Sequence, residues 1–505
     1  MTISPKKIVN FRFFPTLFFS TCVGSLIASL VFNKPFYDYY VLGIGVLLAL
    51  IITLATRRKG KLILVCIVAL LFSYLLCSNQ IGQAIITKDN LCSEVVSVRV
   101  EYVENDSVCV SIKEGLDGVD GLLKFDTSGV YDYPLEIGNE LTLGGVRVSK
   151  LDVLNGDGAI NGYFFNSRTR YTLTATELIE FSEGGRNIVE SIRNSLVSAT
   201  KNLPDDIKGI TIALLTGDKY AVSKEIYDAY KVSGVAHVLA VSGMHVGFLV
   251  IFLEWLLKKI RLKRLIRIII ILPVTFFLCA LCDFTPSVVR SSVMVGVHLL
   301  IPVLTSRRYD MLSSMSLAGV IIVVLNPMSI YSYGFLLSYA SVFGIALFGR
   351  TFQRACRKLP KFISQTVSIS LATTVAVFPL SVYLFGEFSL LSVLTNVLVL
   401  PILTVGYGVL VGLAGIAVIF PPFSFILTGG SWLVYYLNSV TGIIASIDVA
   451  NVSMTAPLWF CVAYYVFTIL LSDFVNFKKT TKVLILIAFI ALCCAYFSFF
   501  CNFSY

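Results

Sequence analysis

Residues 258–282 read KKIRLKRLIRIIIILPVTFFLCALC, a basic cluster followed directly by an apolar segment. The hydrocarbon core of a bilayer takes about 20 apolar residues of helix, and residues 265–282 come close to that length. Because cytoplasmic loops of membrane proteins collect Lys and Arg, the basic cluster marks the cytoplasmic side. This stretch therefore predicts a membrane-spanning helix that begins inside the cell.

The composition extends this prediction to the whole chain. Of its 505 residues, 56% are hydrophobic and only 14% are charged, and the mean hydropathy is +0.84. Soluble domains carry roughly 25% charged residues, so the composition excludes an ordinary cytosolic enzyme. Apolar segments of suitable length predict about thirteen spans, at residues 13–33, 39–56, 61–78, 235–257, 265–282, 287–304, 311–325, 333–349, 366–384, 390–419, 425–447, 457–476 and 483–502.

The loops between these segments indicate the orientation of the chain. Alternation of thirteen spans brings six basic clusters to one side, namely Lys6 to Arg12, Arg57 to Lys61, Lys258 to Arg267, Arg307 with Arg308, Arg350 to Lys361, and Lys478 with Lys479. The positive-inside rule then places the N-terminus in the cytoplasm and residues 79–234 and the C-terminus outside. Topology thus accounts for the basic loops without a nucleic-acid role.

The external segment begins with a region that resembles a β-domain. Within residues 86–181, apolar and polar residues alternate, as at Val96, Val98 and Val100, and Gly-rich turns separate the runs. Short strands of this kind predict a small barrel. Residues 86–185 hold eight Lys and Arg against seventeen Asp and Glu, so this domain gives no sign of binding DNA by bulk charge.

Short helical segments complete the external region. Residues 186–203 form an amphipathic pattern, a second helix follows Pro204 and ends at Gly217, and a third follows Ser223. None is long enough to span a bilayer. We therefore expect residues 186–234 to lie at the outer interface or to re-enter the membrane within the protein.

The densest group of polar residues stands at the start of the fourth predicted span. Residues 233–247 read SGVAHVLAVSGMHVG and hold two of the three histidines of the chain, His237 and His245, together with Ser242. On a continuous helix Ser242 and His245 would be neighbours. On such a helix His237 would lie roughly 12 Å from His245 along the axis.

Several interpretations of this motif are open. Ser242 and His245 would suit a nucleophile and its base in an intramembrane hydrolase, but the motif contains no orienting acid, and only Asp218 would be available if the chain folds back. Two histidines do not make a closed metal site, so no metal is expected. We favour two compatible interpretations, in which Gly243 and Gly247 allow close helix packing and the polar side chains face a conduit.

A second polar group stands where the fifth predicted span turns into the sixth. Asp283 and Arg290 both stand there. Arg290 either forms an ion pair with Asp283 at the interface or faces an aqueous path. A guanidinium on such a path would be a natural phosphate contact. His298, deeper on the same span, is interpreted as a packing residue.

The long apolar stretch at residues 390–419 carries further structural signals. Pro401 within it predicts a broken helix of the kind that surrounds transport paths. Gly408 and Gly412, four residues apart, predict close packing against another helix.

Residues 234–247 resemble the hallmark of the ComEC competence family, the inner-membrane channel proteins of DNA uptake. Other motifs follow in the order of the family, with ALLTGD at 213–218, PSVVR at 286–290, NP at 326–327, GFLLSY at 334–339, FG at 385–386, then Asn396 and Pro401. The resemblance covers residues 205–475 firmly and the first 200 residues more loosely. It implies a polytopic α-helical membrane protein with a small external all-β, OB-like domain inserted after the third span.

The resemblance also implies a function. The chain would be a conduit for single-stranded DNA into the cytoplasm during natural transformation, with Asp218, His237, Ser242, His245 and Arg290 lining or gating the path. No phosphate loop of the G-x-x-x-x-G-K-[ST] type occurs, so no cofactor is expected, and the family implies an external DNA-receptor protein and a cytoplasmic ATP-driven helicase-type motor. The alternatives are an intramembrane hydrolase that uses Ser242 and His245, or a transporter of another polyanionic or lipid-linked substrate.

Two further expectations come from the family. Many relatives carry a C-terminal metallo-β-lactamase-like domain, but none of the three histidines here belongs to an H-x-H-x-D-H cluster. A separate nuclease is therefore expected, and the chain is not expected to be an enzyme. The external domain of the family often carries a disulfide, for which Cys92 and Cys109 are the candidate pair.

The expected domain organisation combines these inferences. It comprises N-terminal transmembrane helices at 1–78, an external OB-like domain at 79–185, interfacial or re-entrant helices at 186–234, a transmembrane competence domain at 235–476 and a final transmembrane helix at 477–505.

Overall fold

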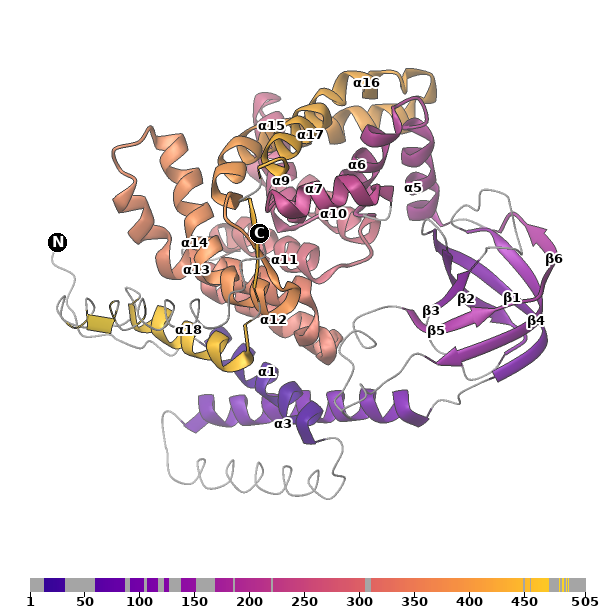
Figure 1. The fold of residues 1–505 in the computed structure, drawn as a ribbon, viewed down its shortest axis with the longest axis horizontal. Coiled ribbons are helices and arrows are strands. Elements are labelled where there is room, and N and C mark those ends of the chain that lie inside the picture. Colours follow the sequence, from indigo (N-terminus) through magenta and orange to yellow (C-terminus); the bar gives the residue numbers. More distant parts are fainter. Residues whose placement is uncertain are drawn as a thin grey trace. The chain divides into compact units, whose positions relative to one another are not determined.

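A computed structural model describes residues 13–31, 60–86, 91–103, 107–116, 122–126, 138–150, 169–184, 187–218, 221–304, 310–447, 450–454, 456–471 and single positions between 481 and 489. The chain divides into two compact units (Figure 1). The larger unit comprises Ala199–Met315 and the described residues from Tyr333 onward, and the smaller one comprises Phe13–Ser198 with Ser316–Ser332.

The smaller unit contains a closed β-barrel. Its strands are β1 (Leu91–Val103), β2 (Ser107–Glu114), β3 (Leu122–Asp126), β4 (Glu140–Lys150), β5 (Thr169–Thr174) and β6 (Glu177–Ser182). The strand order is β1-β2-β3-β5-β4, and an additional pairing of β1 with β4 closes the sheet, while β6 also pairs with β4. Only the pairing of β3 with β5 is parallel.

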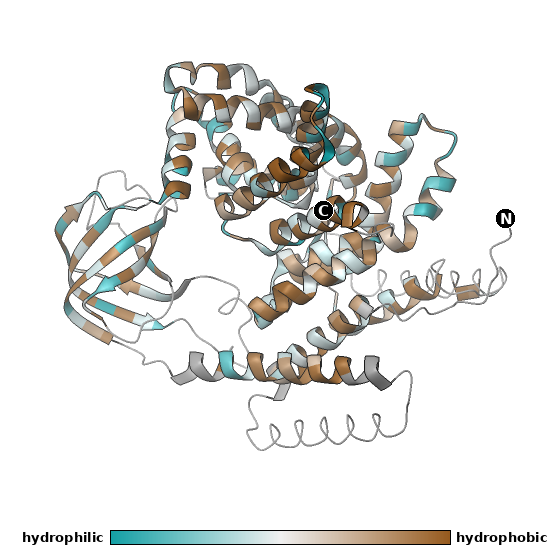
Figure 2. Ribbon diagram, turned by 180° about the vertical axis from the view of Figure 1, so that it is seen from behind, coloured by the Kyte–Doolittle hydropathy of each residue, from teal (hydrophilic) through white to brown (hydrophobic). Residues whose placement is uncertain are grey.

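The barrel core follows from the alternation that the sequence shows. Val96, Val98 and Val100 are fully buried, and they join a cluster of side chains from β2, β3, β4 and β5. The alternation of polar and apolar residues along these strands is visible in Figure 2. In β4 it shifts at Gly145, which has φ of 59°, a left-handed conformation that favours glycine. The predicted small barrel is confirmed.

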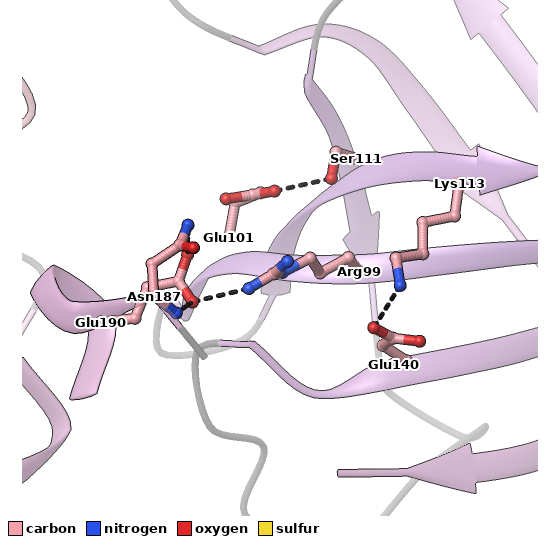
Figure 3. Close-up of polar contacts among 7 residues, drawn as sticks. All are labelled: Arg99, Glu101, Ser111, Lys113, Glu140, Asn187 and Glu190. Carbon is pink, nitrogen blue, oxygen red and sulfur yellow. Dashed lines mark hydrogen bonds and ion pairs between the residues drawn. The ribbon is translucent and has the colours of Figure 1, made fainter. Parts of the chain in front are cut away.

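Helix α5 (Ile188–Ala199) is tied to the barrel by one carboxylate (Figure 3). Oε2 of Glu190 accepts hydrogen bonds from Nη2 of Arg99 on β1 at 2.6 Å and from the backbone N–H of Asn187 at 3.0 Å. Oε1 of the same residue accepts from the Asn187 side chain at 3.2 Å. Glu190 therefore caps the start of α5 and also fixes this helix against β1.

Two apolar helices also belong to the smaller unit. They are α1 (Phe13–Val31) and α3 (Gly60–Ile86). The two helices pack so closely at Gly24 that a Cβ there would collide with the carbonyl of Leu70. The hydroxyls of Ser25 and Ser73 lie 2.7 Å apart between them, and such a hydrogen bond is valuable where no water competes.

The larger unit is helical. Its elements are α6 (Asp205–Thr216), α7 (Lys224–Val232), α8 (Ala236–Leu239), α9 (Gly243–Lys259), α10 (Arg264–Leu281), α11 (Pro286–Leu304), α13 (Tyr333–Ala355), α14 (Lys361–Phe385), α15 (Ser392–Ile419), η3 (Pro421–Phe423), α16 (Ile426–Gly430), α17 (Trp432–Ala445), α18 (Leu458–Leu471) and the hairpin strands β7 (Glu387–Ser389) and β8 (Asn451–Ser453). Helix α12 (Met311–Leu325) contributes to both units, and η2 (Pro327–Tyr331) belongs to the smaller one.

Helix α15 does not break at Pro401. It runs without interruption from Ser392 to Ile419, so the predicted discontinuity at this proline is wrong. A proline displaces the carbonyls one turn before it, and the Leu398 carbonyl accepts a hydrogen bond at 3.1 Å from the Tyr436 hydroxyl on α17. Neighbouring helices can satisfy such groups and keep a membrane helix continuous.

Helix α14 uses the same device at Pro379, which also lies inside the helix. The carbonyl of Val375, four residues earlier, accepts from the Tyr464 hydroxyl at 2.9 Å. The carbonyl of Ala376 accepts from the Tyr465 hydroxyl at 2.7 Å. Two adjacent tyrosines of α18 thus satisfy both carbonyls that this proline frees.

Four described helices are long and apolar enough to cross a membrane: Arg264–Leu281, Tyr333–Ala355, Lys361–Phe385 and Ser392–Ile419. Shorter apolar helices lie at Phe14–Ala28, Val65–Ile81, Pro286–Ile301, Met311–Leu325 and Leu458–Leu471. The predicted spans at 39–56 and, for the most part, 483–502 lie outside the described residues. So do most of the basic clusters near residues 6–12, 57–61, 307–308 and 478–479. The count of thirteen stays a prediction.

The predicted disulfide does not form. Cys92 and Cys109 both carry free thiols. Cys92 lies opposite Arg147 of β4, whereas Cys109 of β2 lies opposite Tyr102, ten residues farther along β1. Ten residues of strand span about 33 Å, and a disulfide needs Cα atoms within about 7 Å. Barrel register therefore keeps the two thiols far apart.

Gly408 of the predicted Gly408–Gly412 pair packs against another helix. A Cβ at Gly408 would lie 2.6 Å from Cγ and 2.7 Å from Cβ of Phe252 on α9. Among the described residues no atom lies within 4 Å of a Cβ at Gly412, so its packing role stays a prediction. Gly412 lies on nearly the same face of α15 as Gly408, but no described atom reaches its Cβ position.

This difference gives a matched pair of variants. Gly408→Ala should destabilise the protein by about 1–3 kcal/mol, because its Cβ would be overpacked against the stem of Phe252. Gly412→Ala should be neutral or stabilising by up to about 1 kcal/mol, because alanine favours a helix over glycine. Thermal unfolding of both purified variants in the same detergent measures this, and equal effects would contradict the packing assigned to Gly408.

Candidate functional site at a helix break

The motif at residues 233–247 does not form one continuous helix. Helix α8 ends at Leu239, Ala240 has φ of −94° and ψ of 130°, and Ser242 is extended at φ of −116° and ψ of 174° before α9 begins. His237 and His245 therefore belong to different helices, and the expected 12 Å of helical rise between them does not apply. The discontinuous helix that Pro401 predicted occurs here instead.

Ser242 and His245 together begin α9. The Ser242 hydroxyl accepts a hydrogen bond from the Met244 N–H at 3.3 Å, and the Ser242 N–H donates to Nδ1 of His245 at 3.1 Å. This reciprocal arrangement is a capping box, which satisfies N–H groups that a helix start leaves without partners. The spacing of three residues thus serves the break rather than a shared helix face.

The same geometry gives no support to a hydrolase. Nδ1 of His245 already accepts the Ser242 N–H, so in the neutral ring the proton resides on Nε2. The Ser242 hydroxyl lies 3.2 Å from Nδ1, but the single lone pair of that nitrogen is engaged. Nε2 is buried and contacts no polar partner among the described residues, so no carboxylate orients the ring as a triad requires.

Arg290 of α11 lies inside the helix bundle with only 7% of its surface exposed. Its Nε donates to the Ser338 hydroxyl of α13 at 2.8 Å, and its guanidinium carbon lies 5.9 Å from the centre of the Tyr339 ring. Nη1 lies 3.4 Å from the sulfur of Met294, a weak acceptor. These contacts orient the guanidinium, which makes further interactions within the structure.

The start of α9 packs directly against this part of α11. A Cβ at Gly243 would collide with the Ser291 hydroxyl and would lie 2.7 Å from Nη2 of Arg290, so the predicted close packing of Gly243 is confirmed. Among the described residues no atom lies within 4 Å of a Cβ at Gly247, so its packing role stays a prediction. Glycine at 243 lets a guanidinium reach the helix N-terminus, where the N–H of Gly243 makes no backbone–backbone hydrogen bond among the described residues.

The α9 N-terminus and the Arg290 guanidinium bring two positive groups together. A helix N-terminus carries the equivalent of about half a positive charge, and Arg290 adds a full one beside it. Backbone N–H groups with an adjacent guanidinium are the donors that bind phosphate and carboxylate. The arrangement can therefore hold an anionic group.

Helix α15 covers the other side of His245. The His245 and Tyr407 rings lie 4.7 Å apart between centres at an angle of 71°, and both side chains are fully buried. Asn396 of the same helix is also buried, with Oδ1 lacking a partner among the described residues. The sequence analysis did not single out Tyr407 or Ser291, and it found Ser338 only as part of the GFLLSY motif, because only tertiary packing brings these residues to His245 and Arg290.

Asp218 lies next to the break, although it belongs to another helix end. Gly217 ends α6 with φ of 82°, and a Cβ there would lie 3.7 Å from Cβ of Val241. Asp218 follows directly, is half-buried and donates its N–H to the Thr216 hydroxyl at 3.3 Å. The predicted role of Asp218 as a gate is untested, but its position brings it to the broken segment.

The remaining histidines stand outside the capping box. His237 is exposed on α8 and lies close enough to His245 to act on it electrostatically, and its predicted place on the conduit stays untested. His298 is exposed on α11 and makes an interaction within the structure, and its interpretation as a packing residue stays a prediction.

Helix α7 holds α8 in place from the other end. The buried Tyr230 hydroxyl donates to Oδ1 of Asn438 at 2.9 Å, and burial raises the pKa of this phenol, which therefore keeps its proton. Lys231 pairs with Glu387 at 3.1 Å. Gly234 has φ of 78°, a left-handed conformation that favours glycine. It also lies close to the start of α15, where a Cβ at Gly234 would be 2.6 Å from Cβ of Ser392. These contacts fix the segment before the break.

Comparison with known proteins identifies the family. Residues 214–476, just over half of the chain, match the family model described as Competence protein. The chain belongs to this family. It is 30% identical over 318 residues to ComE operon protein 3 of Bacillus subtilis, a match that covers 62% of this chain and 40% of that protein. The predicted resemblance to the ComEC competence family is confirmed.

Two further relatives have no described activity. The chain is 28% identical over 223 residues to an uncharacterized protein of Aquifex aeolicus, covering 41% of this chain and 53% of that protein. It is 22% identical over 295 residues to the uncharacterized protein YcaI of Escherichia coli, covering 55% and 39%. The chain thus spans about two-fifths to one-half of these relatives, and no solved structure matches it. Family membership and the apolar helices together indicate a multi-pass membrane protein.

The capping box can be tested by two substitutions at one position. Ser242→Ala removes the side-chain acceptor of the Met244 N–H and should destabilise the protein by about 1 kcal/mol. Ser242→Asn keeps an acceptor at the helix start and should stay within a few tenths of a kcal/mol of the wild type. Thermal unfolding of the three proteins in one detergent checks this, and an Asn variant as unstable as the Ala variant would argue against the cap.

Proposed function

We propose that the protein is a conduit that carries single-stranded DNA across the bacterial inner membrane during natural transformation. The proposal is supported by membership of the Competence protein family and by the name of a relative, ComE operon protein 3. The observation that carries it is the juxtaposition of the α9 N-terminus with the buried guanidinium of Arg290.

Passage of DNA requires contacts with phosphate that form and release repeatedly. The α9 start supplies backbone N–H groups and Arg290 supplies a guanidinium, and both bind phosphate without reading a base. Only one full positive charge is involved, so a single phosphate is attracted but not retained as it would be by several cations. A weak site that faces successive phosphates suits movement better than a tight one.

The break between α8 and α9 explains how such a site can exist in an apolar segment. Irregular backbone within a membrane is tolerated only where it is buried in protein or lines an aqueous path. Discontinuous helices point their N-termini at anionic substrates in membrane transporters. In this proposal His237 and Asp218 lie along the same path, on α8 and at the end of α6, while Ser242 and His245 hold the α9 start.

We propose that the barrel is an OB-fold. Its strand order of β1-β2-β3-β5-β4 with closure on β1, and the parallel pairing of β3 with β5, support this assignment. OB-folds bind single strands on a basic groove with aromatic faces. Because residues 86–185 are acidic, we propose that this barrel docks or orients other parts of the uptake apparatus rather than attracting DNA by charge.

The proposed orientation places the N-terminus in the cytoplasm and the barrel with the C-terminus outside. An external DNA-receptor protein would deliver the strand, and a cytoplasmic ATP-driven helicase-type motor would supply the energy. A separate nuclease would degrade the other strand. These partners, like single-stranded DNA and the surrounding membrane lipid, belong to the proposal.

A transporter of another polyanionic or lipid-linked substrate is the alternative that the anion site also supports. The intramembrane hydrolase has less support, because the Ser242 hydroxyl and Nδ1 of His245 are both engaged in the helix cap. Ser242→Asn removes the hydroxyl and keeps the cap. A hydrolase would lose all activity in this variant, whereas a conduit should retain most of it.

The test is transformation by purified donor DNA, measured together with uptake of labelled DNA into the compartment outside the inner membrane. Arg290→Gln should lower transformation about 10- to 100-fold, since a hydrogen-bonded charged contact contributes about 1.5–3 kcal/mol. Uptake into the outer compartment should be unchanged. Transformation by the Arg290→Lys variant should lie between that of the wild type and that of Arg290→Gln, because lysine keeps the charge but loses the planar donor geometry.

The matched control is Arg264→Gln, which removes an exposed positive charge at the start of α10 and should leave transformation near the wild-type level. Deletion of the gene should abolish transformation and preserve outer uptake. Unchanged transformation in the deleted strain would refute the DNA conduit and leave the transporter of another substrate. Equal loss in the Arg290 and Arg264 variants would refute the anion site.

A further inference from the structure

Two buried polar atoms belong to rings that pack against each other at the helix break. Nε2 of His245 and the hydroxyl of Tyr407 have no hydrogen-bond partner among the described residues. Both side chains are fully buried, and their ring centres lie 4.7 Å apart. They come from different helices, α9 and α15, so the coincidence is one of tertiary packing.

The hydrogen-bond roles of these atoms can be assigned. Nδ1 of His245 accepts the Ser242 N–H, so the neutral ring carries its proton on Nε2, which must donate. The Tyr407 hydroxyl can donate and accept. Nearly all buried polar groups in proteins are satisfied by protein or by ordered water, because leaving one unsatisfied costs free energy. Each of these atoms therefore needs a partner.

Two partners are compatible with the ring geometry. At an angle of 71° the edge of one ring points toward the other, so the Nε2–H group can in principle donate to the π-face of Tyr407. This contact would leave the tyrosine hydroxyl unsatisfied. An internal water molecule would satisfy both atoms at once, and buried waters typically bond to two to four such groups.

We propose that His245 and Tyr407 bind a shared internal water molecule, which accepts from Nε2 and bonds to the Tyr407 hydroxyl. The water fixes the tautomer in which Nδ1 is the acceptor. That tautomer is required by the capping box at Ser242, so Tyr407 acts as a positioning residue for the start of α9. This inference concerns the structure of the break and does not depend on what passes along it.

The chain suits a direct test because it contains only three histidines. Full-length protein labelled with ¹⁵N-histidine and reconstituted in lipid gives three imidazole signal sets in solid-state NMR. His237→Gln and His298→Gln variants assign the His245 signals by subtraction. We expect His245 to show a protonated Nε2, an unprotonated Nδ1 and magnetisation transfer between the Nε2 proton and water.

Tyr407→Phe keeps the ring and removes only the hydroxyl. We expect it to weaken or abolish the transfer from water to His245 and to raise the population of the other tautomer. Tyr436→Phe is the matched control. The Tyr436 hydroxyl of α17 donates to the Leu398 carbonyl of α15, the helix that carries Tyr407, and its removal should leave the His245 signals unchanged.

Three results would overturn the proposal. A protonated Nδ1 in the wild type would exclude the assigned tautomer. A Nε2 proton without transfer from water, unchanged in Tyr407→Phe, would assign the contact to the ring face. Transfer from water that persists unchanged in Tyr407→Phe would show that the tyrosine hydroxyl does not hold the water. Failure of transformation assays on Arg290 variants would leave each of these readouts untouched.

Discussion

The hydrogen bond from the Ser242 N–H to Nδ1 of His245 determines how the central motif is built. It begins α9 inside an apolar segment, where a helix would otherwise continue and leave no free N–H groups. Once the helix begins at Gly243, its N-terminus lies beside Arg290, and the segment before it can turn through Ala240. The break and the approach of the α9 start to Arg290, on which the proposed anion site rests, both depend on this cap.

The rest of the larger unit compensates for irregular backbone in a consistent way. Pro379 and Pro401 displace carbonyls within α14 and α15, and tyrosine hydroxyls from α18 and α17 satisfy them. Tyrosine suits this task because its ring packs in an apolar environment while its hydroxyl reaches a backbone group. Long helices therefore stay continuous at their prolines, and the discontinuity occurs where a serine and a histidine support it.

Local patterns in the sequence predicted the elements that local physics controls. Alternation at Val96, Val98 and Val100 predicted a barrel strand, and Gly217 predicted the end of α6. The predicted disulfide between Cys92 and Cys109 was wrong. The register of the strands separates the two residues along β1, and this register depends on the whole sheet. The helix break predicted at Pro401 was wrong, because the Tyr436 hydroxyl of α17 satisfies a carbonyl that the proline displaces, and α15 stays continuous.

For the site, the sequence by itself determined the polar motif, the family and the identity of Ser242, His245 and Arg290. Spacing along the chain cannot show which helices meet, so it predicted one continuous helix through both histidines. Only the tertiary structure decided that Gly243 meets Arg290 and that Tyr407 covers His245. The reason is physical: a cap is a local hydrogen bond, whereas a binding site is a contact between helices whose order in sequence does not fix their neighbours.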